Sequence, residues 1–237
     1  MSKLPFVWEL DKDGVISYAI GTIHVALNEF EEDVAEKIQG KKRLLPEINH
    51  HEMSPYHEEF IQALFKPFTL NEKNTILDML GLSLDELRSL PPGLFHSYLY
   101  NPAAPEEFPS VDYVLRRKAE QNDLEIISLE TPQEKMQNLH TSNFLEKILA
   151  PARENPDIFG YLPLLLRQSM SREMERYQRG ELQPTHSDLA RNQRMAERSV
   201  EYLDQPSVVG VGASHFLAEP SLLSLYQEKG ITVKRVQ

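Results

Sequence analysis

The sequence Val15-Ile16-Ser17-Tyr18-Ala19-Ile20-Gly21-Thr22-Ile23-His24 is a β-branched apolar run that ends in a glycine and, three residues later, a histidine. A second stretch near the other end of the chain has the same form: Ser207-Val208-Val209-Gly210-Val211-Gly212-Ala213-Ser214-His215. Short runs rich in valine and isoleucine are typical of buried strands, so each histidine stands where a strand ends. Ligands of open α/β sheets bind at the carboxyl ends of the strands. We therefore expect His24 and His215 to lie in one site.

The neighbouring sequence predicts a central sheet that opens with a hairpin. Residues 6–10 and 15–20 have strand character and are joined by Asp11-Lys12-Asp13-Gly14, a four-residue turn that ends in glycine. Further strands are predicted at residues 43–48, 124–129 and 231–236, and helices at residues 28–39, 111–121, 187–202 and 220–228. Alternating strands and helices indicate an α/β fold. We expect a mixed or mostly parallel central sheet flanked by helices.

A helical region interrupts this alternation. Residues 57–100 have helical spacing that is broken by turn residues, which is typical of an insertion. Residues 101–109 are the most proline-dense stretch and suit a linker or an active-site loop. After the predicted strand at 124–129, Thr131 and Pro132 predict the N-cap and first position of another helix. The chain is expected to be a single α/β domain over residues 1–237, with a helical insertion around residues 57–105.

The composition restricts the partners of the chain. Its 36 acidic and 25 basic residues give a formal net charge of −11, which argues against binding to nucleic acids and to anionic membrane surfaces. The absence of cysteine excludes disulfides, thiolate zinc sites and cysteine nucleophiles. The sequence has no apolar run long enough to span a bilayer, and its first residues lack the apolar core of a signal peptide. We expect a cytoplasmic protein that binds a peptide or a small molecule, with its oligomeric state left open.

Three standard functional motifs are only partly matched in the sequence, two of them at the second histidine stretch. Residues 210–215 have a histidine where a dinucleotide fingerprint needs its third glycine. Residues 212–216 lack the closing glycine of a nucleophile elbow. The stretch His51-Glu52-Met53-Ser54-Pro55 begins like a zincin helix but has no second histidine. Dinucleotide binding, serine nucleophiles and conventional zincin chemistry are therefore unsupported.

The remaining candidates are His24, Glu47 and His215 at predicted strand ends, with Glu130 and Arg191 as further members. Two neutral imidazoles and one carboxylate form a three-ligand metal set that leaves a position open for water. Without a metal, a histidine would act as general base, a carboxylate would orient it, and Arg191 would stabilise developing negative charge. The spacing does not separate these two mechanisms.

Each candidate also has a purely structural interpretation. A lone histidine at a strand end is more often hydrogen-bonded to the backbone than catalytic. Glu47 stands among apolar residues, so it needs a cation, a donor or solvent. The pair Arg191-Asn192 lies in an amphipathic helix, where such a polar pair is typical of a solvated face. A polar, acidic segment carries three further histidines, which we expect to be solvated rather than a second metal site: His50, His51 and His57.

Across nearly its whole length the chain resembles the TraB/PrgY/GumN family, which is related to the Tiki-type proteases. The resembling segments, in order, are Phe6-Val7-Trp8, residues 18–24, Glu47 after a strand, Val111-Asp112, residues 127–131, Arg191-Asn192 and residues 209–217. The two Gly-x-x-His motifs are the specific part of this resemblance, and the order of the other segments agrees with it. Ser214 departs from the family's more usual glycine, and Ser110-Val111 from its usual glycine and isoleucine.

The resemblance implies an α/β core with a helical insertion and a metal-dependent hydrolase site. His24, Glu47 and His215 would hold a divalent ion, and manganese, cobalt and zinc are all compatible with imidazole and carboxylate donors. Arg191 would bind an anionic transition state or a substrate carboxylate, and Glu130 would be a general base or the hydrogen-bond partner of a histidine. We expect hydrolysis of a peptide or of a small amide or ester. The alternatives are a metal-free histidine esterase and a non-enzymatic peptide-binding or sequestering protein on the same fold.

Overall fold

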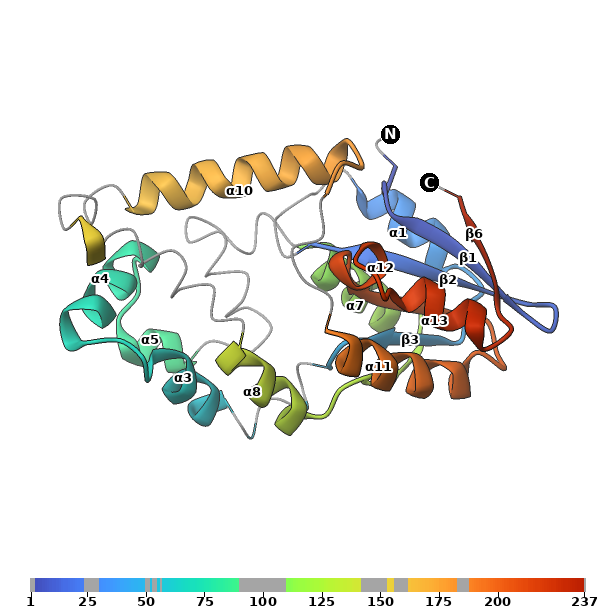
Figure 1. The fold of residues 1–237 in the computed structure, drawn as a ribbon, viewed down its shortest axis with the longest axis horizontal. Coiled ribbons are helices and arrows are strands. Elements are labelled where there is room, and N and C mark those ends of the chain that lie inside the picture. The colour runs from blue at the N-terminus through green and yellow to red at the C-terminus, as the bar shows by residue number, and fades with distance from the viewer. Residues whose placement is uncertain are drawn as a thin grey trace. The chain divides into compact units, whose positions relative to one another are not determined.

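The computed structural model describes residues 3–23, 30–49, 52, 55, 57–89, 110–141, 153–155, 162–182 and 188–236. The chain divides into two compact units (Figure 1). The first unit comprises Met1–Asn49, Phe108–Glu130 and Glu173–Gln237, and the second comprises His50–Glu107 and Thr131–Arg172. The predicted insertion at residues 57–105 falls in the second unit, which also takes in residues 131–172.

The first unit is built on a mixed sheet with the strand order β4-β3-β5-β2-β1-β6 in the described residues. The strands are β1 (Val7–Lys12), β2 (Val15–Thr22), β3 (Arg43–Pro46), β4 (Glu125–Ile126), β5 (Ser207–Gly212) and β6 (Thr232–Arg235). The neighbours β4, β3, β5 and β2 are parallel, whereas β1 is antiparallel to both β2 and β6. The α/β class and the mostly parallel sheet are therefore confirmed.

The opening hairpin is confirmed, but its turn is tighter than the sequence predicts. Lys12 pairs with Val15, so the loop consists of Asp13 and Gly14 alone. Both residues have positive φ, 54° and 84°, which is the backbone that a two-residue type I′ loop requires. Asp11, predicted as a turn residue, lies in the β1–β2 ladder, and its Oδ1 accepts a hydrogen bond from the Gly14 N–H.

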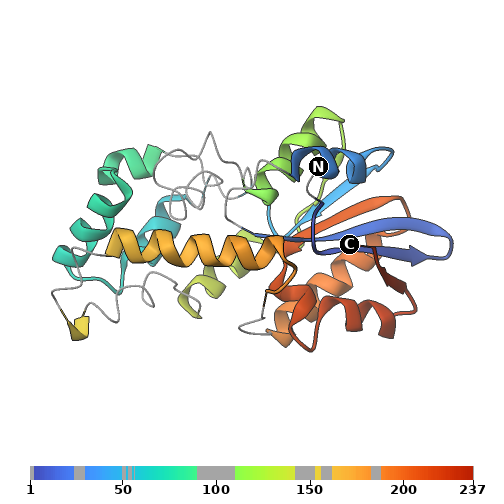
Figure 2. The ribbon, with the colours of Figure 1, turned by 90° about the horizontal axis from the view of Figure 1, so that it is seen from above.

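Helices cover both faces of this sheet (Figure 2). On one face α1 (Glu31–Ile38) packs against α7 (Val111–Gln121), and both contact β5. On the other face lie α11 (Leu189–Tyr202), α12 (Ser214–Leu217) and α13 (Leu222–Glu228). The central strand β5 is buried along nearly its whole length, as expected for a parallel strand covered on both sides.

The strand β4 is shorter than predicted, yet its backbone continues alongside β3. The ladder pairs only Glu125 and Ile126, whereas the sequence predicts a strand over residues 124–129. Beyond the ladder, Leu129 N–H donates to Pro46 O at 2.9 Å and Glu130 N–H donates to Glu47 O at 2.8 Å. These bonds bring Glu47 and Glu130 side by side at the carboxyl ends of two adjacent parallel segments.

The second unit is helical in its described residues. Its helices are α3 (His57–Phe65), α4 (Leu70–Leu80), α5 (Leu84–Ser89), α8 (Pro132–Thr141) and the first part of α10 (Leu162–Gln178). Thr131 caps α8 as predicted: its hydroxyl accepts from Glu134 N–H, and the Glu134 carboxylate accepts from Thr131 N–H. The proline-dense stretch at residues 101–109 lies outside the described residues. Among the helices that the structure describes, none is both long enough and apolar enough to cross a membrane.

Gly21 lies where three segments of the first unit meet. A Cβ atom at this position would lie 3.0 Å from the Phe6 Cβ and 3.1 Å from the Ala213 Cα and Cβ. The Gly21 carbonyl accepts a 2.6 Å hydrogen bond from the buried Tyr177 hydroxyl. Burial raises the pKa of the Tyr177 phenol, and the charges of Asp112 and Asp33 raise it further, so the hydroxyl keeps its proton and donates. The glycine of the first motif is therefore required by close packing.

We expect Gly21→Ala to lower the free energy of unfolding by about 1–3 kcal/mol, because its neighbours are backbone and Cβ atoms that cannot rotate away. Gly210→Ala is the matched control, since its Cβ would meet only the ends of the Leu115 and Leu44 side chains. Urea unfolding of both variants measures the difference. Equal losses of stability at the two positions would contradict the packing argument.

Candidate functional site

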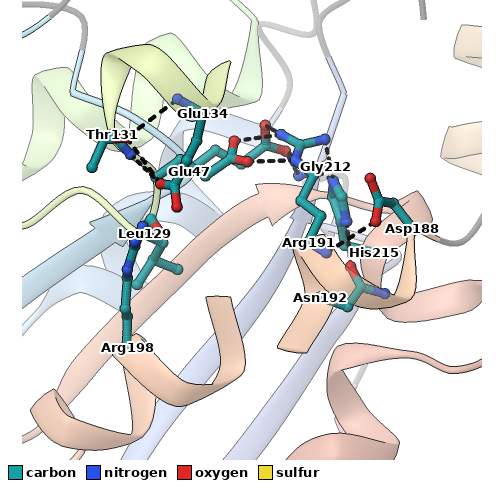
Figure 3. A network of polar contacts seen from close by, with 11 residues as sticks. Glu47, Leu129, Thr131, Glu134, Asp188, Arg191, Asn192, Arg198, Gly212 and His215 are labelled. Atoms are coloured by element: carbon teal, nitrogen blue, oxygen red, sulfur yellow. Dashed lines mark hydrogen bonds and ion pairs between the residues drawn. The ribbon is translucent and has the colours of Figure 1, made fainter. Parts of the chain in front are cut away.

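A cluster of charged and polar side chains lies at the carboxyl ends of β3 and β5 and beside the segment that follows β4 (Figure 3). We call it the Arg191 cluster, and it consists of Glu47, Glu130, Arg191, Asn192 and His215. Glu47 follows β3 and His215 follows β5, whereas Arg191 and Asn192 lie in the first turn of α11. The cluster lies wholly within the first unit.

Glu47 directly follows β3 and bridges the backbone of β5 and the guanidinium of Arg191. Its Oε1 accepts from Gly212 N–H at 2.8 Å, and its Oε2 accepts from Arg191 Nη2 at 2.7 Å. A Cβ atom on Gly212 would lie only 3.1 Å from Oε1. The glycine of the second motif thus lets a carboxylate reach the backbone at the end of β5.

Arg191 and Glu130 form a bidentate ion pair. The Arg191 Nε and Nη2 each lie 2.6 Å from one oxygen of Glu130. The Glu130 side chain is 2 % exposed and that of Arg191 is 15 % exposed, so each charge needs its partner. Burial alone would lower the pKa of Arg191, but the charges and hydrogen bonds of Glu47 and Glu130 outweigh it and raise this pKa above its ordinary value. Arg191 is therefore always a cation in the folded protein.

Hydrogen bonds fix the orientation and tautomer of His215. The Asn192 Nδ2 donates to Pro220 O at 2.8 Å, so the Asn192 Oδ1 faces the His215 Nδ1 at 2.6 Å as an acceptor. His215 Nδ1 therefore carries a proton, and in the neutral ring Nε2 carries a lone pair. Arg191 Nη1 lies 3.0 Å from this Nε2 and donates to it. The Glu47 Oε1 lies 3.6 Å from the same nitrogen.

The position of Asn192 corrects the interpretation of Arg191-Asn192 as a solvated face. Asn192 is fully buried. It belongs to the stripe of α11 that faces the core, together with Met195, Ala196 and Ser199. Those four positions have the i, i+3, i+4, i+7 spacing of one helix face. The sequence analysis did not predict Asn192 as a site residue. The signal that could have identified it is its position as a polar residue on the apolar face of an amphipathic helix.

The structure brings four of the five candidate site residues together: Glu47, Glu130, Arg191 and His215. The fifth, His24, lies outside the described residues. The strand that leads to it is described, and Thr22 at the end of β2 pairs with Gly212 of β5. Of the three histidines expected to be solvated, His50 and His51 lie outside the described residues and His57 begins α3.

Two atoms of the cluster fit donors to a single metal ion. Glu47 Oε1 and His215 Nε2 are 3.6 Å apart, close to the separation of about 3.3 Å between tetrahedral ligands with metal bonds of about 2.0 Å. A ligating histidine usually donates its other ring N–H to an acceptor, as His215 does to Asn192. Within the described part of the chain, no group of three or more His, Asp or Glu residues is arranged to hold a metal. The third predicted donor is His24.

A buried hydroxyl lies on the same side of the sheet as these donors. Paired residues of parallel strands point to the same face, so Thr22 shares its face with Gly212, whose missing Cβ would point at Glu47. Thr22 is 2 % exposed, and its Oγ1 has no hydrogen-bond partner among the described residues. Because an unsatisfied buried hydroxyl is costly, this atom favours a polar ligand at the site.

Comparison with known proteins places the whole arrangement in one family. No curated protein and no solved structure matches the chain significantly. The sequence profile of the TraB/PrgY/gumN family matches residues 6–235. This match contains every strand of the sheet and every member of the Arg191 cluster. The chain belongs to the TraB/PrgY/gumN family.

Proposed function

We propose that the chain is a metal-dependent hydrolase that cleaves a peptide or a small amide or ester at the Arg191 cluster. The observation that carries the proposal is the fixed geometry of His215. Its Nδ1–H is held by Asn192, and its Nε2 faces Glu47 Oε1 at 3.6 Å. One imidazole nitrogen and one carboxylate oxygen are thus presented together, each oriented by a second hydrogen bond.

The formal charge of the cluster is compatible with a bound cation. Glu47 and Glu130 contribute two negative charges, Arg191 contributes one positive charge, and the neutral His215 contributes none, so the formal sum is −1. The four side chains are at most 15 % exposed, and solvent compensates this charge poorly. Glu47 and His215, with His24 as the third predicted donor, would hold manganese, cobalt or zinc. When bound, such an ion supplies Lewis acidity toward the scissile carbonyl and the attacking water.

The protein residues have separate roles in this proposal. Arg191 binds both glutamates and offers a donor to the oxyanion that develops on the substrate carbonyl. A guanidinium has five N–H donors, and the described contacts of Arg191 use both on Nη2, one on Nε and one on Nη1. The other Nη1 hydrogen is the donor available to substrate. Glu130 binds Arg191 through both oxygens, which favours an anchoring role over the general-base role considered from the sequence.

The first test is metal binding by protein that has been stripped with a chelator and refilled with manganese, cobalt or zinc. We expect close to one ion per chain, and at least about a hundredfold weaker binding in His215→Ala and Glu47→Gln, because each variant removes a donor. His24→Ala tests the predicted third donor in the same way. Glu125→Gln is the matched control, since that exposed carboxylate pairs with Arg43 at the other end of β3 and β4 and should not change binding.

Activity is measured on the same samples with a peptide library and a set of chromogenic esters. Hydrolysis that needs the ion and is lost in His215→Ala would support the proposal. Activity that survives chelation but is lost in His215→Ala would indicate the metal-free histidine mechanism instead. A folded wild type that binds none of the three ions would contradict a metal-dependent enzyme.

Asn192→Ala tests the orientation of His215. We expect metal affinity to fall by about 10- to 100-fold, because the ring loses the acceptor that fixes its tautomer. Asn192→Asp should recover only part of the affinity, since its carboxylate can still accept from Nδ1–H but its second oxygen cannot donate to Pro220 O. Isothermal titration with the preferred ion measures both variants. An Asn192→Ala protein with wild-type affinity would show that the hydrogen bond does not position the histidine for metal binding.

A further inference from the structure

We propose that Arg191 competes with the metal ion for the Nε2 atom of His215. When the metal binds, this arginine would release an N–H group that can then donate to the substrate. This inference rests on the proposed metal site and adds a role for Arg191 in setting metal affinity. It starts from one contact, the 3.0 Å approach of Arg191 Nη1 to His215 Nε2.

The competition follows from the electrons of a single atom. A neutral imidazole has one lone pair in the ring plane, and the proton on Nδ1 assigns it to Nε2. That lone pair accepts the hydrogen bond from Arg191 Nη1. The same lone pair is the one that would bind a metal. His215 Nε2 therefore binds either the arginine or the ion, and metal binding must break this hydrogen bond.

Glu47 imposes no such choice. A carboxylate oxygen has two lone pairs, so Glu47 Oε1 can keep its 2.8 Å bond from Gly212 N–H while it binds an ion. The other oxygen, Oε2, carries the bond from Arg191 Nη2. Of the two bonds that Arg191 makes to the proposed metal ligands, the one to His215 Nε2 is therefore the one that an ion would displace.

The bond to Glu130 determines what happens to Arg191 when it loses His215. The bidentate pair uses Nε and Nη2 on one edge of the guanidinium, whereas the bond to His215 uses Nη1 on the other. Glu130 is nearly fully buried and holds that edge in place. A small rotation would free Nη1 without breaking the ion pair. Metal binding would then give Nη1 two N–H groups for a substrate oxygen, in place of the one it offers while bound to His215.

A charge-matched double variant, Arg191→Met with Glu130→Gln, tests the competition. The formal charge of the cluster stays at −1, because one cation and one anion are removed together. Methionine cannot donate to Nε2, so we expect this variant to bind Co²⁺ at least about tenfold more tightly than the wild type. Glu130→Gln alone keeps Arg191 and should not tighten binding. The absorbance of bound Co²⁺ reports the dissociation constant, and circular dichroism checks the fold.

A second measurement uses the wild type and does not depend on the folding of the double variant. The side-chain ¹⁵N signals of Arg191, assigned by their loss in Arg191→Lys, should shift when Zn²⁺ saturates the protein. Unchanged Arg191 signals at saturation, or equal Co²⁺ affinities in the wild type and the double variant, would overturn the competition and leave the metal site standing. Failure of both proteins to bind any ion would remove the metal site itself, and with it the proposed function.

Discussion

The guanidinium of Arg191 joins the carboxyl ends of the sheet into one site. It binds Glu130 after β4, Glu47 after β3 and His215 after β5, and these segments are adjacent in the sheet. Burying these charges is costly unless every partner is in place. The cluster therefore constrains the register of β3 against β5 and the position of the first turn of α11. Removing the cation alone would take an ion-pair partner from two carboxylates that are 12 % and 2 % exposed.

The two glycines of the repeated motif have different physical roles, although the sequence presents them as equivalent. Gly21 allows the chain to pack against Phe6 and Ala213 without a side chain. Gly212 allows the Glu47 carboxylate to reach a backbone N–H. The paired strands β2 and β5 place both glycines at the carboxyl-terminal end of the parallel strands. A repeated sequence pattern can therefore reflect a shared location rather than a shared function.

Local periodicity predicts most of the fold, because buried strands and amphipathic helices show it directly. The hairpin and α7 over residues 111–121 follow from such patterns, and the cap of α8 follows from the residue types Thr131 and Pro132. The length of β4 does not, because hydrogen bonds to β3 replace a regular ladder beyond Ile126. The contacts between side chains in the site also cannot be predicted from local sequence patterns. From the sequence, Asn192 is expected to be a polar surface residue. In the structure it is buried, because it lies on the face of α11 that packs against the core. Residue type and strand-end position suggest Glu47 and His215, but only tertiary structure shows that Arg191 links them.

The composition of the cluster exceeds what a structural ion pair needs. One glutamate would neutralise Arg191, and the bidentate bond to Glu130 already does so. Glu47 adds a second carboxylate that is only 12 % exposed, and Asn192 holds a histidine with its lone pair directed toward that carboxylate. Each addition costs desolvation without filling an apolar core. The carboxylate oxygens and the oriented ring nitrogen are donor types that metal sites use, which is why we propose a metal there. This cost in stability is the physical reason for proposing that the cluster has a function beyond holding the fold together.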